Sequence, residues 1–351
     1  MRIGLPREIK DGEHRVALTP AGVSALVRSG HEVVFEPGLG AGIGISDRAY
    51  ETAGGRTGNP WEAELVVKVK ELQEPEFGLP RKGQTVFSFQ HFGPEPALLV
   101  AALASGATFI AFETVGQADA SLPILAPMSA IAGRLAVQVG AWCLQKHNGG
   151  SGVLLSGLKG IAPGKIVILG AGNVGSNALA VAHGIGAEVV VFAKSEKKFD
   201  FLQRAFPTVK FRKDSPERDI QSADLVIGGV LMPGRMSPKL ITRAMLRAMR
   251  LGSALVDVGI DQGGIAETSR PTSHSDPVYV EEGVVHYCVP NMPAAAAHTA
   301  SLALEHAVLP FVVLLTENAM TNALKTGVQV SSGKVTHEFL ARDTGRPFQP
   351  S

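Results

Sequence analysis

Four titratable side chains lie where the chain leaves a predicted strand: Arg15, Lys70, His91 and Asp261. A guanidinium can bind a carboxylate through two hydrogen bonds, and an ammonium can polarise a carbonyl oxygen. A histidine exchanges a proton near neutral pH, and a carboxylate can position water or ammonia. Together these are the tasks required to oxidise a 2-amino acid to a 2-oxo acid by loss of hydride.

Taken singly, each of these side chains has an ordinary structural explanation. Arg15 could instead pair with Glu8 or Glu13. Asp257 lies inside a predicted strand and is expected to be structural, whereas Asp261 precedes a Gln-Gly-Gly turn. What favours the four candidates is their position, because the carboxyl ends of the strands line the ligand site in open α/β sheets.

A glycine-rich loop, Gly-Ala-Gly-Asn-Val-Gly, follows an apolar strand and precedes a helical run. In this spacing the first glycine makes a tight turn, the second lets the backbone approach a pyrophosphate, and the third lets helix and sheet pack closely. The helix N-terminus supplies unpaired amides and partial positive charge to the phosphates. We therefore predict a dinucleotide site made by Gly170, Gly172, Asn173, Val174 and Gly175.

The strand after this loop ends in Ala193, Lys194 and Ser195. An Asp or Glu there would accept hydrogen bonds from the ribose 2′-hydroxyl and repel a 2′-phosphate. This chain has neither, and its hydroxyl and ammonium groups, with Lys197 and Lys198 just beyond, would suit a 2′-phosphate. The alternative is that these lysines are ordinary solvated charges. We predict NAD or NADP as cofactor, with NADP(H) slightly favoured.

The elements that position these residues follow from the sequence pattern. A chain of 351 residues is long for one core, so two domains are expected. Short β-branched runs alternate with helical patterns, which predicts an α/β fold of two doubly wound, Rossmann-type domains. Residues 1–127 with 295–351 would form a discontinuous substrate domain, and residues 128–294 the dinucleotide-binding domain. The predicted strands are 2–5, 32–35, 65–70, 85–89, 108–113, 165–169, 189–192, 225–228, 254–258 and 284–287.

Helices are predicted from caps and apolar runs. Thr19 and Pro20 form the N-cap and first position of a helix that ends near Ser29. A second helix is expected over 95–105, and a long apolar helix starts near Ser129 and leads into the second domain. After residues 291–293 the chain returns to helix through about Leu324, and these late helices are expected to rejoin the first domain.

Composition excludes several classes of function. The formal net charge is +1, from 33 basic and 32 acidic residues, so nucleic acid is not an expected partner. The two cysteines, Cys143 and Cys288, lie in apolar surroundings and predict neither a disulfide framework nor a metal site. No apolar signal segment opens the chain, and the apolar run 306–315 contains Pro310 and is shorter than the ~20 residues of a membrane span. A soluble, cytoplasmic protein is expected.

In its ordered motifs the chain resembles the alanine dehydrogenase family over nearly its full length, and more remotely the nucleotide-binding alpha subunit of proton-translocating transhydrogenase. The matching segments are 1–8, 13–22, 67–71, His91, 125–134, 170–175, 223–228, 256–264 and 291–293.

This resemblance implies a hexamer of two-domain subunits with the active site in the interdomain cleft. It implies that Arg15 and Lys70 bind the substrate and that His91 and Asp261 act in catalysis. It also places Ser129, Asn291 and Met292 on the nicotinamide side of the cofactor. The implied reaction converts L-alanine, water and oxidised cofactor to pyruvate, ammonium and reduced cofactor.

The chain departs from the family pattern at the edge of the site. Ala193 stands where the family carries aspartate, and Leu72 and Gln73 stand where proline usually follows the lysine–glutamate pair. One alternative is therefore an NADPH-dependent condensation of pyruvate with an amino-acid amine, as in N5-(carboxyethyl)ornithine synthase. A second is a dinucleotide-binding subunit of the transhydrogenase type with no chemistry on a small substrate.

Overall fold

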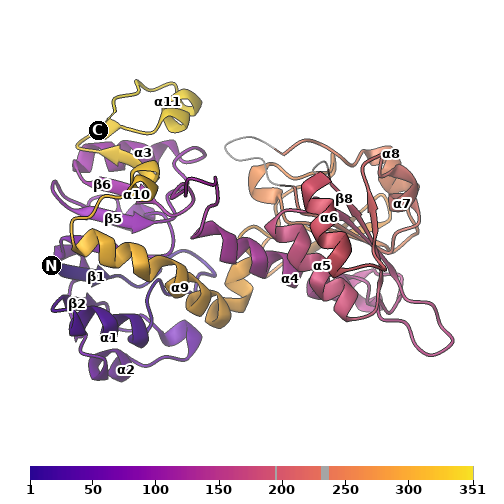
Figure 1. Ribbon diagram of the computed structural model, residues 1–351, viewed down its shortest axis with the longest axis horizontal. Helices are drawn as coiled ribbons and strands as arrows, with labels where there is room; N and C mark the ends of the chain where they lie inside the picture. The colour runs from indigo at the N-terminus through magenta and orange to yellow at the C-terminus, as the bar shows by residue number, and fades with distance from the viewer. Residues whose placement is uncertain (194–195, 231–236, 351) are drawn as a thin grey trace. The chain divides into compact units, whose positions relative to one another are not determined.

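The computed structural model describes residues 1–193, 196–230 and 237–350 (Figure 1). The chain forms two compact units. Unit 1 contains Met1–Met128 and Ala296–Ser351, and unit 2 contains Ser129–Ala295. The two ends of the chain therefore build one unit, and the middle of the chain builds the other.

Unit 1 is built on an 8-stranded sheet in the order β15-β14-β6-β5-β4-β1-β2-β3. The strands from β6 to β3 are parallel, and the strand order reverses direction between β1 and β4. This doubly wound order confirms the predicted α/β class, and ligands of such sheets bind beyond the carboxyl ends of the strands near that reversal. The strands are β1 (Arg2–Leu5), β2 (Glu32–Phe35), β3 (Arg56–Thr57), β4 (Leu65–Val67), β5 (Thr85–Ser88), β6 (Thr108–Ala111), β14 (Val328–Ser331) and β15 (Lys334–Val335).

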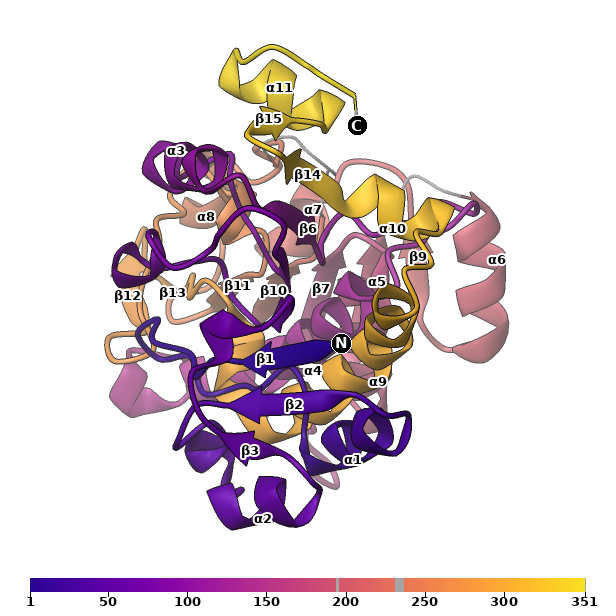
Figure 2. The same cartoon turned by 90° about the vertical axis from the view of Figure 1, so that its left-hand side faces the viewer.

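Helices from both ends of the chain pack on this sheet. Helix α1 (Pro20–Arg28) begins as predicted, with the Thr19 hydroxyl capping the first turn. Helix α9 (Ala297–Thr316) lies against α1 in both views (Figures 1 and 2), and its Glu305 carboxylate accepts hydrogen bonds from the Thr19 and Gly22 amides. The remaining helices are α2 (Asp47–Thr52), α3 (Pro96–Ser105), α10 (Asn322–Gly327) and α11 (Glu338–Thr344).

Helix α9 corrects one expectation. Pro310 lies inside the helix and does not end it, and the helical stretch Met292–Thr316 has 25 residues. By length and composition alone this stretch is long and apolar enough to cross a membrane. The prediction that the apolar run around Pro310 is too short for a membrane span was therefore wrong. Leu304, Val308 and Val312 on this helix are fully buried within unit 1. A buried core helix passes the same length test, so the stretch is weak evidence for a membrane span.

Unit 2 repeats the same architecture. Its 7-stranded sheet has the order β12-β13-β11-β10-β7-β8-β9, parallel except for β12. The strands are β7 (Lys165–Leu169), β8 (Glu188–Phe192), β9 (Lys210–Arg212), β10 (Leu225–Gly228), β11 (Ala254–Asp257), β12 (Val278–Glu281) and β13 (Val284–Tyr287). The helices are α4 (Leu125–Cys143), which belongs to unit 2 from Ser129 on, α5 (Asn173–Gly184), α6 (Glu196–Ala205), α7 (Glu217–Gln221) and α8 (Arg243–Arg247). Helix α4 starts four residues before Ser129, the predicted start, since Pro127 is tolerated in a first helical turn.

Candidate active site

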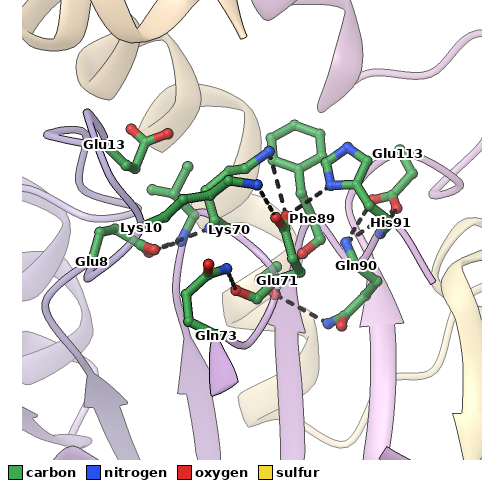
Figure 3. Close-up of polar contacts among 12 residues, drawn as sticks. Glu8, Lys10, Glu13, Lys70, Glu71, Gln73, Phe89, Gln90, His91 and Glu113 are labelled. Atoms are coloured by element: carbon green, nitrogen blue, oxygen red, sulfur yellow. Dashed lines mark hydrogen bonds and ion pairs between the residues drawn. The ribbon is translucent and has the colours of Figure 1, made fainter. Parts of the chain in front are cut away.

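In unit 1 three loops meet beyond the carboxyl ends of adjacent parallel strands. The loop after β1 carries Lys10 and Arg15, the loop after β4 carries Lys70, and the loop after β5 carries His91. Figure 3 shows Lys10, Lys70 and His91 converging on one carboxylate, that of Glu71. The fold thus brings together the predicted residues Lys70 and His91.

Glu71 is surrounded by hydrogen-bond donors. Its Oε2 lies 2.9 Å from His91 Nδ1 and 3.4 Å from Lys70 Nζ, and its Oε1 binds Lys10 Nζ. Burial would raise the pKa of Glu71, but the hydrogen bond from His91, the charge of Lys70 and the hydrogen bond from Lys10 hold that pKa well below its usual range. Glu71 is therefore an ionised carboxylate at neutral pH, 6% exposed, between cationic groups.

His91 is held at its ring and at its backbone. The ring stacks on Phe89, with centroids 5.8 Å apart, and the side chain is 42% exposed. The residue has φ +46°, a left-handed conformation that costs free energy outside glycine. The Glu113 carboxylate accepts hydrogen bonds from the Gln90 and His91 amides, with the His91 amide 2.9 Å from Oε1. These contacts fix a strained loop that presents the imidazole at the surface of unit 1.

Arg15 also lies in this region but is already bound by a carboxylate. Its Nε and Nη2 donate to the two oxygens of Glu13 at 2.7 and 2.5 Å. Its Nη1 lies 3.2 Å from the Met128 sulfur, a weak acceptor, and the residue is 2% exposed. The structural alternative for Arg15, an ion pair with Glu13, is thus present in the molecule.

A second group of charges lies behind the Lys70 loop. Glu8 Oε1 accepts hydrogen bonds from the Val69 and Lys70 amides, at 2.5 and 3.3 Å. Lys68, fully buried, donates to Glu76 at 2.6 Å and lies 3.7 Å from Glu8 Oε2. Burial raises the pKa of Glu8 to about 7, against the opposing charge of Lys68. This cluster anchors the end of β4 and so positions Lys70.

The sequence interpretation missed three residues of this site: Lys10, Glu71 and Glu113. Each lies within a few residues of a predicted strand end, as the chosen residues do. Glu71 directly follows Lys70, and this position just after the predicted strand 65–70 was the available signal. Which of several charged neighbours points into a site depends on side-chain direction, which residue order does not reveal.

The dinucleotide loop of unit 2 has the geometry that its glycines predict. Gly170 has φ +106°, and its amide donates to the Phe192 carbonyl at 2.7 Å. A Cβ on Gly175 would lie 1.7 Å from the Gly170 carbonyl oxygen, so only glycine fits. A Cβ on Gly172 would meet no heavy atom of the described residues within 4 Å, which leaves open space among them beside the backbone. Asn173 and Val174 begin helix α5, where the first-turn amides lack intrahelical acceptors.

These features fit a dinucleotide. The open space at Gly172 and the amides at the start of α5 form a cradle of the kind that binds a pyrophosphate. Ala193 follows β8, is half-buried, and is tied by its amide to the Arg212 carbonyl at 3.2 Å. The other two residues predicted at the ribose, Lys194 and Ser195, lie outside the described residues.

Asp257 and Asp261 differ as the sequence pattern suggests. Asp257 is fully buried and accepts hydrogen bonds from the Gly259 amide, the Ile265 amide and the Ser269 hydroxyl, at 3.1, 2.7 and 2.5 Å. Burial raises its pKa, partly offset by these hydrogen bonds. Asp261 is exposed in a 3₁₀ turn of the loop that Asp257 organises. Asp261 belongs to unit 2, unlike the other three catalytic or substrate-binding candidates.

The predicted nicotinamide-side residues also lie in unit 2. Ser129 is half-buried in α4, and Met292 is 3% exposed in the core of the unit. Asn291 has φ +55°, in the left-handed region like His91. Within residues 1–193, 196–230 and 237–350, no group of three or more His, Cys, Asp or Glu side chains could hold a metal ion.

Taken together, one doubly wound unit with converging lysine, histidine and carboxylate groups and another with a dinucleotide loop define a class, the nicotinamide-dependent oxidoreductases of two-domain α/β type. Two family descriptions narrow this class: the N-terminal domain of alanine dehydrogenase/PNT matches residues 4–132, and its C-terminal domain matches residues 136–338. The chain belongs to the alanine dehydrogenase/PNT family, and the resemblance noted in the sequence is confirmed.

Similar proteins agree with this assignment. An alanine dehydrogenase of Halomonas elongata is 47% identical over 363 aligned positions, which cover 99% of this chain and 98% of the relative. A solved L-alanine dehydrogenase has a TM-score of 0.95 at 42% identity, covering 98% of this chain and 99% of its own. A transhydrogenase from Sinorhizobium meliloti has a TM-score of 0.83 at 27% identity, covering 96% and 99%.

Proposed function

We propose that this protein oxidises L-alanine to pyruvate and ammonium, with water as co-substrate and a nicotinamide dinucleotide as hydride acceptor. The observation that carries the proposal is the convergence of Lys70 and His91 at the carboxyl end of one doubly wound sheet, in a chain whose second sheet bears a dinucleotide loop. Proteins named alanine dehydrogenase, 42–47% identical over nearly the whole chain, support it.

We assign the substrate to unit 1. Lys70 polarises the carbonyl oxygen of the 2-oxo acid, and His91 exchanges a proton with the water that adds and the ammonia that leaves. Arg15 binds the substrate carboxylate through its guanidinium, which Glu13 also engages. Asp261 acts as the second catalytic residue, from unit 2, by orienting water or ammonia. The interdomain cleft expected from the resemblance stays a prediction.

We assign the dinucleotide to unit 2. The backbone of Gly170, Gly172 and Gly175 and the α5 amides of Asn173 and Val174 hold the pyrophosphate. The nicotinamide supplies the hydride acceptor when bound. The same proposal assigns residues to the two ends of the cofactor. Beside the nicotinamide lie Ser129, Asn291 and Met292. Beside the adenosine ribose lie Ala193, Lys194 and Ser195.

Three finer features belong to the same proposal. NADP(H) is accepted, because no carboxylate stands at Ala193 to repel a 2′-phosphate. The protein acts in the cytoplasm, as expected from its composition, and as a hexamer, as the family resemblance implies. Neither alternative activity is favoured, since relatives named alanine dehydrogenase match at higher identity than the transhydrogenase does.

A turnover screen tests the proposal. The purified protein is assayed with L-alanine and each oxidised cofactor, and with pyruvate and each reduced cofactor in the presence of ammonia, ornithine or lysine. We expect turnover of L-alanine and of pyruvate with ammonia. Faster turnover with ornithine or lysine than with ammonia would favour the condensation, and cofactor binding without turnover would favour the transhydrogenase type. Light scattering of the same sample measures the oligomeric state.

A further inference from the structure

We propose that Glu71 is a positioning residue for the reaction: it fixes the His91 imidazole in the tautomer that carries its proton on Nδ1, and holds the Lys70 ammonium beside that ring. This inference rests on the proposed function, because it concerns how His91 and Lys70 act there. It makes Nε2 of His91 the nitrogen that exchanges protons with the substrate.

The first step of the argument is the position of Glu71. One carboxylate touches groups from three separate loops, through Lys10 after β1, Lys70 after β4 and His91 after β5 (Figure 3). Glu71 itself is 6% exposed, whereas the His91 side chain is 42% exposed. The carboxylate thus lies behind the imidazole, and the imidazole presents its other nitrogen away from Glu71.

The second step concerns the proton. An ionised carboxylate can only accept hydrogen bonds, and the surrounding positive groups keep Glu71 ionised. Since Glu71 Oε2 lies 2.9 Å from His91 Nδ1, the nitrogen must donate. In the neutral imidazole a proton on Nδ1 leaves Nε2 as a bare acceptor, which is the form a general base requires.

The third step concerns charge. Lys10 Nζ and Lys70 Nζ both contact Glu71, and a protonated His91 would add a further positive charge. Like charges this close repel one another, and an anion between them offsets that repulsion. Glu71 is that anion, so its charge, and not only its shape, is required to hold the two lysines and the histidine together.

The backbone contacts of His91 separate this role from simple loop stability. Glu113 holds the His91 and Gln90 amides, and Phe89 packs against the ring. The loop conformation is therefore maintained by other groups, while Glu71 acts on the ring. Replacing Glu71 should change what the imidazole does more than where the loop lies.

The experiment compares Glu71→Gln, an uncharged side chain of the same shape, with Glu74→Gln, which removes an exposed carboxylate three residues away. For each variant we measure kcat and KM for L-alanine, the affinity for reduced cofactor, and thermal unfolding. We also record the proton spectrum downfield of the amides, where an Nδ1 proton shared with a carboxylate resonates. His91→Asn identifies the His91 signal by its loss.

For Glu71→Gln we expect kcat to fall by about 10- to 100-fold, by analogy with removal of the carboxylate that orients a metal-bound histidine. KM should change less than kcat, cofactor affinity should stay at the wild-type value, and the His91 signal should disappear. Glu74→Gln should match the wild type in every measurement. Glu71→Asp, which restores the charge on a shorter side chain, should recover part of kcat.

The proposal is overturned by normal kcat in Glu71→Gln, by survival of the His91 signal in that variant, or by absence of the signal from the wild type. Failure of both Glu71 variants to fold would assign Glu71 to stability and overturn the proposal as well. A wild type that shows the His91 signal but does not oxidise L-alanine would instead refute the proposed function and leave the hydrogen bond established.

Discussion

Unit 1 and unit 2 have the same reversal of strand order, yet the loops beyond their strand ends carry different kinds of residue. In unit 1 the loops carry charged side chains, and each buried cation has a carboxylate partner: Arg15 has Glu13, and Lys68 has Glu76. In unit 2 the loop after β7 carries glycines, and what it offers a ligand is backbone amides and space. The fold thus decides where a ligand binds, and the loop residues decide which ligand.

The difference has a physical cause. A small substrate must be gripped and must exchange protons, which requires side chains with charge and titratable nitrogen. A pyrophosphate is large and already charged, so amide dipoles at a helix start suffice once no side chain blocks their approach. Substitutions should therefore act through charge in unit 1 and through volume in unit 2.

The largest effect should come from adding volume to the glycine loop. In Gly175→Ala the new methyl would lie 1.7 Å from the Gly170 carbonyl oxygen, a backbone atom that cannot move aside without opening the turn. We expect loss of cofactor binding and destabilisation of unit 2 by about 3 kcal/mol or more. Thermal unfolding and fluorescence titration with NADH measure both effects.

Gly172→Ala is the matched variant, because its methyl would meet no heavy atom within 4 Å in the part of the chain that the structure describes. It should unfold at the wild-type temperature while binding NADH about 10- to 100-fold more weakly, since the methyl takes the space that the pyrophosphate needs. If this variant bound NADH normally, the phosphates would not approach Gly172, and the role given to volume in unit 2 would be wrong.

In unit 1 the largest effect should come from His91. Replacement by alanine should lower kcat by the ~10²–10⁴ typical of a lost general acid–base group. Cofactor affinity should hardly change, because His91 belongs to the other unit. Steady-state kinetics and NADH titration check both points, with Asp261→Asn as the parallel test in unit 2. Near-normal kcat across the pH range would remove His91 from the mechanism, and full activity in Asp261→Asn would leave Asp261 a turn residue.

The contrast between the units also explains what the sequence could predict. The apolar strands β1, β7, β10 and β13 have the predicted bounds, because β-branched runs between turn residues define them. The short strands β3 (Arg56–Thr57) and β9 (Lys210–Arg212) were not predicted. Both lie at sheet edges and are polar, so pairing with a neighbour, not composition, makes them strands.

The candidate site residues also differ between the units in how far the sequence predicts them. The glycine loop of unit 2 was predictable because φ and volume requirements restrict the residue type at each position. In unit 1 the sequence located the strand ends but not the carboxylates behind them. Glu71 and Glu113 are 42 residues apart in sequence, by their numbers, and meet only through His91 in the folded chain. Side-chain contacts of this range depend on tertiary packing.

A smaller effect, on stability, tests the charges behind Lys70. Burial raises the pKa of Glu8 to about 7 from 4.5, so the folded chain holds a proton that the unfolded chain releases as the pH rises. This stabilisation is complete below pH 4.5 and is lost as the pH rises through about 7. Glu8→Gln, always neutral, should therefore gain stability relative to the wild type, by about 3 kcal/mol between pH 4.5 and 8.

Urea unfolding of both proteins at several pH values measures this difference, and groups common to both cancel. Glu74→Gln, at an exposed position, provides the control and should follow the wild-type curve. Parallel curves for the wild type and Glu8→Gln would show that Glu8 is ionised in the folded protein at neutral pH. Lys68 would then lie beside two charged carboxylates, those of Glu76 and Glu8.

The smallest expected effect concerns a position beside the glycine loop of unit 2 where charge should matter, Ala193. Its amide is tied to the Arg212 carbonyl, and the preceding Phe192 carbonyl binds the Gly170 amide at 2.7 Å, so Ala193 lies next to the glycine loop. An aspartate there would accept hydrogen bonds from a ribose 2′-hydroxyl and repel a 2′-phosphate. We expect the wild type to use NADPH at least as well as NADH, and Ala193→Asp to shift kcat/KM toward NADH by about tenfold or more.

Steady-state kcat/KM with both cofactors, in wild type and variant, decides the point. Ala193→Ser is the matched control, because it adds a polar group without charge and should shift the preference less. In Ala193→Asp the new carboxylate should repel the 2′-phosphate of NADPH, so NADPH binding should fall. The same carboxylate should accept hydrogen bonds from the ribose of NADH, so NADH binding should gain. A wild type strongly selective for NADH would show that a missing carboxylate is not enough to admit the 2′-phosphate. In that case the volume of the loop, and not its charge, would govern cofactor choice throughout unit 2.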